Sequence, residues 1–358
     1  MMNLLKNCKL LIVGGGGFVG SNLCKKLLLD YDPKEIVVVD NFISSEITNL
    51  PEDSRLTVIS ESITDDGVLS SLPADLRYVF HLSCYHGNQS SIHSPLEDHA
   101  NNLLTSLKLF ERLKGLRGLE KVVYSAAGCA VAQKTKFQAE ATMEEAPVSL
   151  FHDSPYSISK LVGEMYGNYY YTHCEMPFVK ARFQNVYGPG EILGAGMWRG
   201  TPHTVWRNVT PSFIWKALYK EALPLDNGGV ATRDFIYVDD IVEGLIACAL
   251  KGIPGEAYNL ASGDETSIRE WAEMICEITS NPTPFVSKPA RSWDNSIKRY
   301  GSTSKSMNEL NFSAKVNKVE GLKKTIEWTK KNRERILSSM LKHLDELPDL
   351  EAYSRGAL

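Results

Sequence analysis

A run of glycines that follows a short apolar segment constrains the fold of this chain more than any other feature. Residues 10–13 are apolar, and residues 14–20 then read GGGGFVG. Gly14, Gly17 and Gly20 fit the pattern GxxGxxG, and a second register, GxGxxG, begins at Gly15. Without side chains, the backbone can turn tightly from a strand into a helix whose N-terminus binds a pyrophosphate. The sequence therefore predicts a dinucleotide-binding turn made of Gly14, Gly17, Phe18, Val19 and Gly20.

An acidic residue follows the second predicted strand, where a dinucleotide-binding unit needs one. Asp40 follows the next apolar segment, 36–39, twenty residues after Gly20. A carboxylate at this position binds the ribose hydroxyls of NAD and repels the 2′-phosphate of NADP, and no Lys or Arg follows within residues 41–45. We therefore expect NAD as the cofactor, with Asn41 and Ser45 beside Asp40 in its site. The competing interpretation is that Asp40 only caps a loop.

The apolar segments of the first half alternate with helical patterns. Strands are expected at 10–13, 36–39, 56–59, 78–82, 122–124 and 178–183, with helices such as 20–29 and 101–113 between them. This alternation predicts an α/β fold of the Rossmann type, a doubly wound parallel sheet with a smaller C-terminal substrate-binding region. We expect a nucleotide-binding domain at 1–185, a mainly substrate-binding region at 186–330 that could return strands to the sheet, and a C-terminal helix and tail at 331–358.

Composition excludes several function classes. The net charge is −4 and the pI about 6.1, so no surface for nucleic acid or anionic membranes is expected. The seven cysteines lack metal-ligand spacing, and the histidines at 81, 86, 93 and 99 are expected to be core or surface residues, so no metal site is predicted. An odd number of scattered cysteines fits a reducing compartment. The apolar segment near the N-terminus is too short for a signal peptide or a membrane span, and we expect a cytoplasmic protein.

A tyrosine and a lysine four residues apart form the candidate catalytic pair. Tyr156 and Lys160 lie in a predicted helix for which Ser154 is the N-cap and Pro155 the first residue. The spacing puts both side chains on one helix face, where the ammonium would lower the pKa of the phenol. Tyr156 could then take a proton from a substrate hydroxyl while hydride leaves the same carbon. Lys160 could also bind the nicotinamide ribose. The spacing alone is a weak signal, and its position behind the glycine turn gives it weight.

Taken together, these motifs resemble the extended short-chain dehydrogenase/reductase family, in its branch of nucleotide-sugar epimerases and dehydratases. The resemblance covers about residues 9–330. It rests on the glycine turn, Asp40, the Tyr–Lys pair and four further segments, namely FHLS at 80–83, RFQNVYGP at 182–189, RDFIYVDD at 233–240 and YNLASG at 258–263. It implies an NAD-dependent enzyme that acts on a nucleotide-diphosphate sugar and forms a homodimer through two helices, one of which carries Tyr156 and Lys160.

The resemblance also assigns roles around the cofactor. Ser62 and Ile63 stand where an acid and an aliphatic residue usually contact the adenine, and the serine weakens that match. Leu82, in the FHLS segment, belongs to the cofactor site. Asn101 matches a helix asparagine that supports the active-site strand.

Other matching positions concern the substrate. Asn185 and Asn208 match residues that hold the sugar nucleotide, and Arg233 and Arg299 match arginines that clamp its diphosphate. For the two arginines the alternative is a surface ion pair. Gln89 stands where uronic-acid 4-epimerases carry an arginine for the sugar carboxylate, so a neutral hexose or an acetamido or deoxy relative is expected.

The chain departs from the family pattern after the strand at 122–124. Ala127 occupies the position of the hydroxyl residue that usually accompanies the tyrosine, and Ser125 lies two residues earlier. Gly128 and Cys129 replace the Asp-Glu pair of sugar 4,6-dehydratases, which disfavours ordinary dehydration. Cys129 matches the acid/base cysteine of GDP-mannose 3,5-epimerase, and a thiol could exchange a proton next to a ketone. The alternative role for Cys129 is packing.

The expected function is NAD-dependent epimerisation at C4 of an NDP-hexose through a transient 4-keto sugar, with Tyr156 and Lys160 as catalytic residues. Two alternatives stay open. Cys129 could add proton exchange and give 3,5-epimerisation or an atypical elimination, which solvent deuterium at a ring carbon would reveal. The missing hydroxyl at Ala127 also leaves room for an NAD-binding regulator or scaffold without chemistry.

Overall fold

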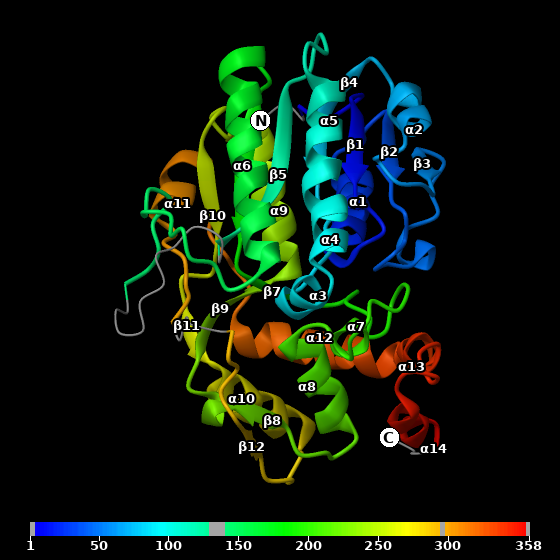
Figure 1. The fold of residues 1–358 in the computed structure, drawn as a ribbon, viewed down its shortest axis with the longest axis vertical. Helices are drawn as coiled ribbons and strands as arrows, with labels where there is room; N and C mark the ends of the chain where they lie inside the picture. Colours follow the sequence, from blue (N-terminus) through cyan, green and yellow to red (C-terminus); the bar gives the residue numbers. More distant parts are fainter. Residues whose placement is uncertain (1–3, 129–139, 294–297, 356–358) are drawn as a thin grey trace.

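The computed structural model describes residues 4–128, 140–293 and 298–355 (Figure 1). Its centre is a seven-stranded sheet in the order β10-β6-β5-β4-β1-β2-β3, in which every neighbouring pair is parallel. The strands are β1 (Lys9–Val13), β2 (Glu35–Val39), β3 (Leu56–Ile59), β4 (Leu76–His81), β5 (Lys121–Ala127), β6 (Phe178–Phe183) and β10 (Ala257–Leu260). The doubly wound α/β fold predicted from the alternating pattern is confirmed.

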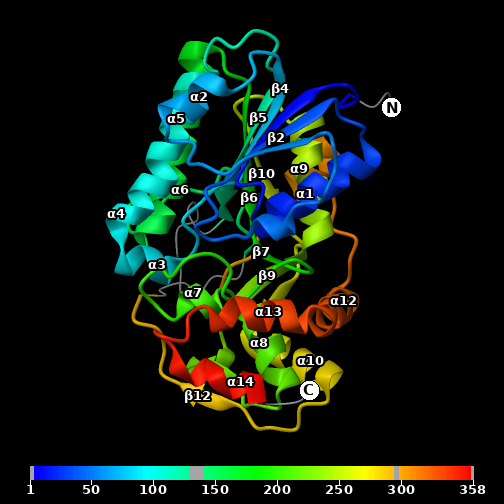
Figure 2. The same ribbon diagram turned by 90° about the vertical axis from the view of Figure 1, so that its right-hand side faces the viewer.

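The continuous apolar runs of the strands reflect burial on both faces of the sheet. In β1, Leu10 and Ile12 pack on one face, and Leu11 and Val13 pack on the other. The first face is covered by α1 (Phe18–Asp30) and α9 (Val238–Lys251), and the second by α2 (Asp66–Ser71), α5 (Thr105–Leu113) and α6 (Pro155–Cys174). Figure 2 shows these as layers on either side of the sheet.

The strand order places a crevice at the carboxyl edge of the sheet. Because β1 lies between β2 and β4, the connections that leave β1 and β4 run in opposite directions. Ligands of open α/β sheets bind at such a switch point. The glycine turn after β1 and the ends of β4 and β5 all lie at this edge.

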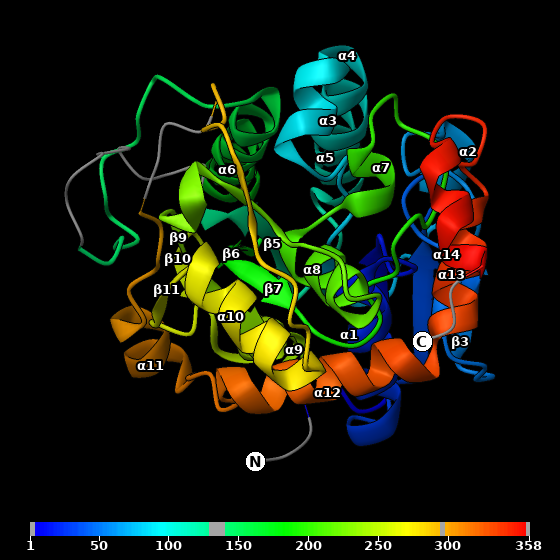
Figure 3. The ribbon, with the colours of Figure 1, turned by 90° about the horizontal axis from the view of Figure 1, so that it is seen from below.

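The smaller part of the molecule lies beyond the carboxyl ends of the strands, at the bottom of Figure 1. It contains a three-stranded sheet, β11-β9-β7, and a two-stranded sheet, β12-β8. These strands are β7 (Asn185–Tyr187), β8 (Pro224–Asp226), β9 (Thr232–Tyr237), β11 (Glu265–Ser267) and β12 (Val286–Lys288). The helices there are α7 (His203–Trp206), α8 (Val209–Leu218), α10 (Ile268–Thr279), α12 (Lys318–Lys331), α13 (Arg333–Leu341) and α14 (Ala352–Arg355), seen from below in Figure 3. The residues after 185 thus also supply α9, α11 (Ser304–Leu310) and the edge strand β10 to the larger part.

One helix differs from its predicted form. The predicted helix at 101–113 is preceded by α3 (Asn88–His93) and α4 (Pro95–Asp98), and its first turn belongs to a π-helical segment, η2 (His99–Leu104), that continues into α5. The buried side chains nevertheless recur at helical spacing through both segments, at Asn102, Thr105, Ser106, Leu109, Phe110 and Leu113. Asn102 is buried in this segment, whereas Asn101 is partly exposed and donates to the backbone oxygen of Glu97.

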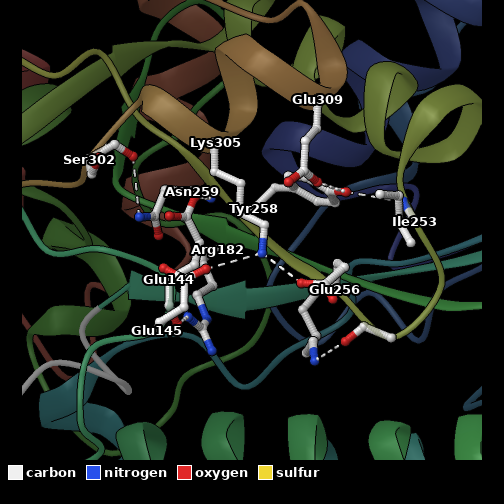
Figure 4. A network of polar contacts seen from close by, with 12 residues as sticks. Glu144, Glu145, Arg182, Ile253, Glu256, Tyr258, Asn259, Ser302, Lys305 and Glu309 are labelled. Carbon is white, nitrogen blue, oxygen red and sulfur yellow. Dashed lines mark hydrogen bonds and ion pairs between the residues drawn. The ribbon is translucent and has the colours of Figure 1, made fainter.

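A buried polar network joins the segment after residue 140 to the edge of the sheet (Figure 4). Arg182 in β6 forms a two-bond ion pair with Glu164 in α6, at 3.0 and 2.8 Å, and its third nitrogen donates to the backbone oxygen of Glu144. The Glu144 carboxylate in turn accepts the backbone N–H of Asn259 in β10 at 2.8 Å. Because these buried charges are paired and hydrogen-bonded, removing either partner would leave an uncompensated charge.

The packing of α6 on the sheet depends on a glycine, which gives a stability prediction. A methyl group at Gly167 would lie 2.0 Å from the ring of Phe178. We expect Gly167→Ala to lower the free energy of unfolding by about 1–3 kcal/mol, since α6 must move away from β6. Thr172→Ala, at an exposed position of the same helix, should change it by less than about 0.5 kcal/mol. Urea denaturation measures both, and wild-type stability of Gly167→Ala would contradict this packing.

Candidate active site

The turn after β1 is built so closely that two of its positions require glycine. Gly14 has φ +84°, and a Cβ there would lie 2.5 Å from the backbone nitrogen of Ser83 at the end of β4. A Cβ at Gly20 would lie 2.3 Å from the carbonyl oxygen of Gly14. Gly17 is the N-cap of α1 and has no side chain to cap it, so Phe18 and Val19 begin a helix whose N-terminus can accept a pyrophosphate.

Asp40 lies beside this turn and is tied to it. Its Oδ2 accepts the backbone N–H of Gly16 at 2.8 Å, and its Oδ1 accepts from the backbone of Phe42 and the hydroxyl of Ser45 at 2.9 and 3.0 Å. Burial raises the pKa of Asp40, and these three donors oppose that rise. Asn41 is exposed next to it. The carboxylate is therefore fixed at the end of β2, where it would meet a ribose.

The remaining positions predicted to contact the cofactor lie along the same edge. Ser62 is half-buried and its hydroxyl contacts that of Thr64 at 2.8 Å, while Ile63 is only 3% exposed. The backbone N–H of Leu82 donates to Val13 at 2.8 Å, which joins the ends of β4 and β1. The glycine cradle, the helix N-terminus and the buried acid together fit an NAD molecule, and Ser62 stands where the expected adenine pair has its acid.

Tyr156 and Lys160 both lie at the start of α6, as their spacing predicts. The hydroxyl of Ser154 accepts the backbone N–H of Ser157 as the N-cap, and Pro155 is the first helical residue. Lys160 is 2% exposed, and its ammonium lies 6.0 Å from the centre of the Tyr156 ring. A buried ammonium at this range favours the phenolate form of the tyrosine.

The end of β5 binds Lys160 and has Ala127 at the position where a serine or threonine was expected. Lys160 Nζ donates to the backbone oxygen of Ser125 at 2.8 Å and lies 3.4 Å from its Oγ. Ala127, the last residue of β5, packs against Leu161 and Tyr156. The methyl group of Ala127 thus lies where a serine or threonine would meet the tyrosine, and Ser125 supports Lys160 instead. Cys129 lies outside the described residues.

A histidine lies on the other side of the tyrosine. The rings of His86 and Tyr156 are 6.0 Å apart, and the buried Arg199 donates to the backbone oxygen of His86 at 3.1 Å while lying over the ring of Tyr85. The surrounding protein desolvates His86 and lowers its pKa to about 3, and Arg199 adds to this effect. His86 is therefore a neutral imidazole and a weak base. Sequence reasoning placed it only among core or surface histidines, since no pattern marks it.

The asparagine that supports the site is Asn102. It accepts the backbone N–H of Tyr85 at 2.7 Å and donates to Asp98 at 2.7 Å and to the hydroxyl of Ser159 at 3.3 Å. Asn101, which was expected in this role, donates instead to Glu97, whereas Asn102 lies on the buried face of the helix with Ser106 and Phe110. Tyr85, whose backbone N–H is bound by Asn102, precedes His86 in the loop after β4. Asn102 therefore also restrains the position of that histidine.

Two predicted substrate residues lie at the border with the smaller part. Asn185 begins β7, and Asn208 is the N-cap of α8. The side chain of Asn208 does not cap the helix and instead donates to Oε1 of Glu191 at 2.5 Å. Gln89 lies in the first turn of α3, half-buried, and the neighbouring Asn88 accepts the hydroxyl of Ser154 at 2.9 Å. Gln89 is thus placed near the N-terminus of α6.

The two predicted arginines lie on different elements. Arg233 is in β9 and donates to the backbone oxygen of Thr232 at 2.7 Å. Arg299 forms an ion pair with Asp153, at 2.5 Å, just before α6 begins. Asp153 is 2% exposed and Arg299 15%, so this is not a surface ion pair. Arg299 therefore lies close to the tyrosine helix.

Other kinds of site were also sought. Across residues 4–128, 140–293 and 298–355, no group of three His, Cys, Asp or Glu side chains is arranged to hold a metal ion. No helix within these ranges is both long and apolar enough to cross a bilayer.

Known proteins with a similar sequence belong to one family. The model of the NAD dependent epimerase/dehydratase family matches residues 10–261. A protein of Mycolicibacterium smegmatis named UDP-glucose 4-epimerase is 29% identical over 322 residues, which cover 89% of this chain and 97% of that protein.

Two solved structures share the fold over almost the whole chain. The Bordetella bronchiseptica enzyme WbmF, crystallised with NAD+ and UDP, is 54% identical with a TM-score of 0.87 and covers 98% of this chain and 100% of its own. The epimerase Mth375 of Methanothermobacter thermautotrophicus is 36% identical with a TM-score of 0.86, over 94% of this chain and 96% of its own. The chain therefore belongs to the NAD-dependent epimerase/dehydratase family of nucleotide-sugar enzymes, and NAD is its cofactor.

Proposed function

We propose that the chain interconverts the C4 epimers of a nucleotide-linked hexose through a transient 4-keto sugar. The observation that carries this proposal is the buried Lys160 ammonium beside Tyr156, at the sheet edge where the NAD turn lies. The name of the M. smegmatis relative supports C4 as the reacting carbon. UDP in the crystals of WbmF supports a uridine nucleotide in the substrate.

Tyr156 and Lys160 would carry the proton transfer. Bound NAD supplies a reversible hydride acceptor for the C4 hydrogen. The phenolate of Tyr156 takes the C4 hydroxyl proton, and the Lys160 ammonium stabilises that phenolate. Because Ala127 offers no hydroxyl, the proton passes to Tyr156 directly or through water. After the keto sugar has rotated, Tyr156 would return the proton to the C4 oxygen, and the reversible hydride chemistry that NAD supplies when bound would give the epimer.

The substrate nucleotide would lie between the sheet edge and the smaller part. Arg233 and Arg299 would bind the diphosphate, with Arg299 leaving Asp153 for a stronger anion. The N-terminus of α8, which the Asn208 side chain does not cap, adds a favourable dipole. Asn185 and Gln89 would then line the sugar.

A single substitution tests the catalytic assignment. We expect Tyr156→Phe to lower the turnover of UDP-hexoses by at least about a hundredfold, because the proton acceptor is lost. Its NAD content should stay at the wild-type level. Tyr169→Phe, an exposed tyrosine of the same helix, is the matched control and should leave turnover unchanged. Products from a panel of UDP-, GDP-, dTDP- and CDP-sugars are identified by NMR, and wild-type turnover by Tyr156→Phe would refute the assignment.

A second candidate is proton exchange at C3 or C5 of the keto sugar. Its acid/base group would be Cys129, and the missing hydroxyl at Ala127 favours it, because a proton at the sugar then needs another group. Reaction in D2O separates the two. C4 epimerisation returns the same hydrogen and incorporates no deuterium, whereas exchange labels a ring carbon. A protein that turns over no member of the panel would instead fit an NAD-binding regulator.

Glu191 gives a pH prediction for this region. Burial raises the pKa of Glu191 to about 7, although Asn208 and Arg207 act against the rise, and its Oε2 is buried without a hydrogen-bond partner among the described residues. A carboxyl whose pKa is higher in the folded than in the unfolded state loses stability as pH rises. Between about pH 5 and 7 the contribution of Glu191 to stability should fall, by roughly 3 kcal/mol at most, while the buried neutral His86 changes stability in the opposite direction.

The matched variant is Glu191→Gln, which can still accept a hydrogen bond from Asn208. We expect the melting temperature of the wild type, relative to that of Glu191→Gln, to fall as pH rises over the same window, as measured by calorimetry on both proteins. Parallel curves for the two proteins would show that Glu191 is ionised in the folded state throughout.

We also propose that the chain forms a homodimer through α6 and the neighbouring helical segment. Exposed apolar side chains on these elements support it, at Ile92, Leu96, Leu104, Ile158, Met165 and Tyr169. Ile158, Met165 and Tyr169 recur at helical spacing on α6. Light scattering should give the mass of a dimer for the wild type and of a monomer for Leu96→Glu combined with Met165→Glu, since two charges would be buried in the contact. A monomeric wild type would refute the proposal.

The cellular location is likewise a proposal. We propose the cytoplasm, which the six described cysteines support because none of them is in a disulfide. Cell fractionation would test it.

A further inference from the structure

The C-terminal helix α13 lies against the loop that joins β2 to β3, far from it in sequence. In that loop, Glu46 accepts hydrogen bonds from Ser339 and Lys342, at 2.8 and 2.6 Å. Arg335 donates to the hydroxyl of Thr48 at 2.8 Å. This loop begins with Asp40 and Ser45, so α13 contacts the segment that carries the proposed ribose-binding acid.

One of these contacts continues into the glycine turn. Arg335 Nη2 donates to Oδ1 of Asn49 at 2.5 Å, and Nδ2 of Asn49 donates to the carbonyl oxygen of Gly16 at 2.8 Å. Asn49 is only 6% exposed. Because the guanidinium can only donate, it fixes the amide of Asn49 with its NH2 group toward Gly16. The charge also strengthens the bond.

Two consecutive peptide groups of the NAD turn are fixed in this region. The chain of hydrogen bonds from Arg335 through Asn49 to Gly16, called the relay below, fixes one, and Asp40 fixes the other. The Gly16 carbonyl and the Gly17 N–H belong to one peptide, which Asn49 holds at one end and the oxygen of Gly14 holds at the other, at 3.2 Å. The N–H of Gly16 belongs to the preceding peptide and donates to Asp40. These two N–H groups are used within the turn. Because glycine has a wide choice of backbone conformations, fixing their peptides also fixes the direction of the N–H groups at the start of α1, which would meet a pyrophosphate.

The same loop is held from its other side by the segment before α8. The backbone N–H of Met197 donates to Ile43 at 3.0 Å, and Arg207 donates to the backbone oxygen of Ser44 at 2.6 Å. This segment also contacts α13, since His343 donates to the oxygen of Gly194 at 2.8 Å. The loop therefore lies between two supports, and α13 is the one that reaches the glycine turn.

We propose that Arg335 is a positioning residue for NAD, which acts through Asn49 to hold the Gly16–Gly17 peptide in the conformation from which α1 starts, with the N–H groups of Phe18 and Val19 toward the pyrophosphate. The proposal extends the cofactor site to residues 333–341, a helix that sequence reasoning left without a chemical role. It rests on the cofactor, not on the C4 reaction, and its test requires no sugar.

The test is NAD binding to cofactor-free protein, followed by NADH fluorescence and calorimetry. Arg335→Ala should raise the dissociation constant for NAD about tenfold or more, because a charge-assisted hydrogen bond to a buried amide is lost. Arg335→Lys should recover part of this affinity, since an ammonium can still donate to Asn49. Lys331→Ala, which removes the same charge from an exposed position, is the first control and should bind like the wild type.

Two further variants separate the relay from simple docking of the helix. Glu46→Gln weakens the other contact of α13 and should leave NAD affinity within about twofold of the wild type. Asn49→Ala should weaken NAD as much as Arg335→Ala does, and the double variant should be no weaker than either, because both changes break one chain of bonds. Equal losses in Glu46→Gln and Arg335→Ala, or wild-type affinity in Arg335→Ala, would overturn the proposal, as would fully additive losses in the double variant.

Discussion

The candidate active site, at the carboxyl edge of the sheet, depends on the close contact between the backbones of Gly14 and Ser83. At this point the turn after β1 touches the end of β4, with no room for even a methyl group. The contact brings the cofactor turn against the strand whose following loop carries Tyr85 and His86, and β5 lies next to that strand. A bulkier turn would push the two strand ends apart, and the NAD turn and the Tyr–Lys pair would no longer face one crevice. The arrangement of the site thus depends on how closely the turn after β1 and the end of β4 can approach each other.

In the proposed catalytic pair, Tyr156 lies beside Lys160, which is almost fully buried. Lys160 is held by the backbone of Ser125, and its ammonium also lies 5.1 Å from the ring of Tyr124. A carbonyl oxygen and an aromatic face stabilise a cation without neutralising it, unlike a carboxylate. The positive charge therefore stays available to Tyr156. With Ala127 in place of a hydroxyl residue, this charge and the nearby His86 are the groups that could guide a proton at the sugar.

The sequence was enough to predict the sheet, the glycine turn, Asp40 and the placement of Tyr156 and Lys160, because apolar runs, glycine spacing and helix capping are local signals. It did not single out Asn102, because two asparagines stand side by side at 101 and 102, and only the packing of the helix, which buries Asn102 with Ser106 and Phe110, decides between them. His86 and Glu191 were missed as site residues for a different reason, since each depends on neighbours more than ten residues away, such as Arg199 and Asn208. The role of α13 was also hidden, because a polar helix near the end of a chain resembles a solvated tail.

The hydrogen bonds of Gly16 link positions that are very far apart along the chain. Their donors and acceptors come from residues 40, 49 and, through Asn49, 335. Domains begin to fold during synthesis from the N-terminus, and β1 to β6 can form their sheet when fewer than 200 residues have been made. The last bond of the relay must wait for α13, about 150 residues later. A ribosome-bound chain can therefore complete most of its sheet while its cofactor turn is still loosely held, and full NAD affinity would require a chain that has been synthesised past α13.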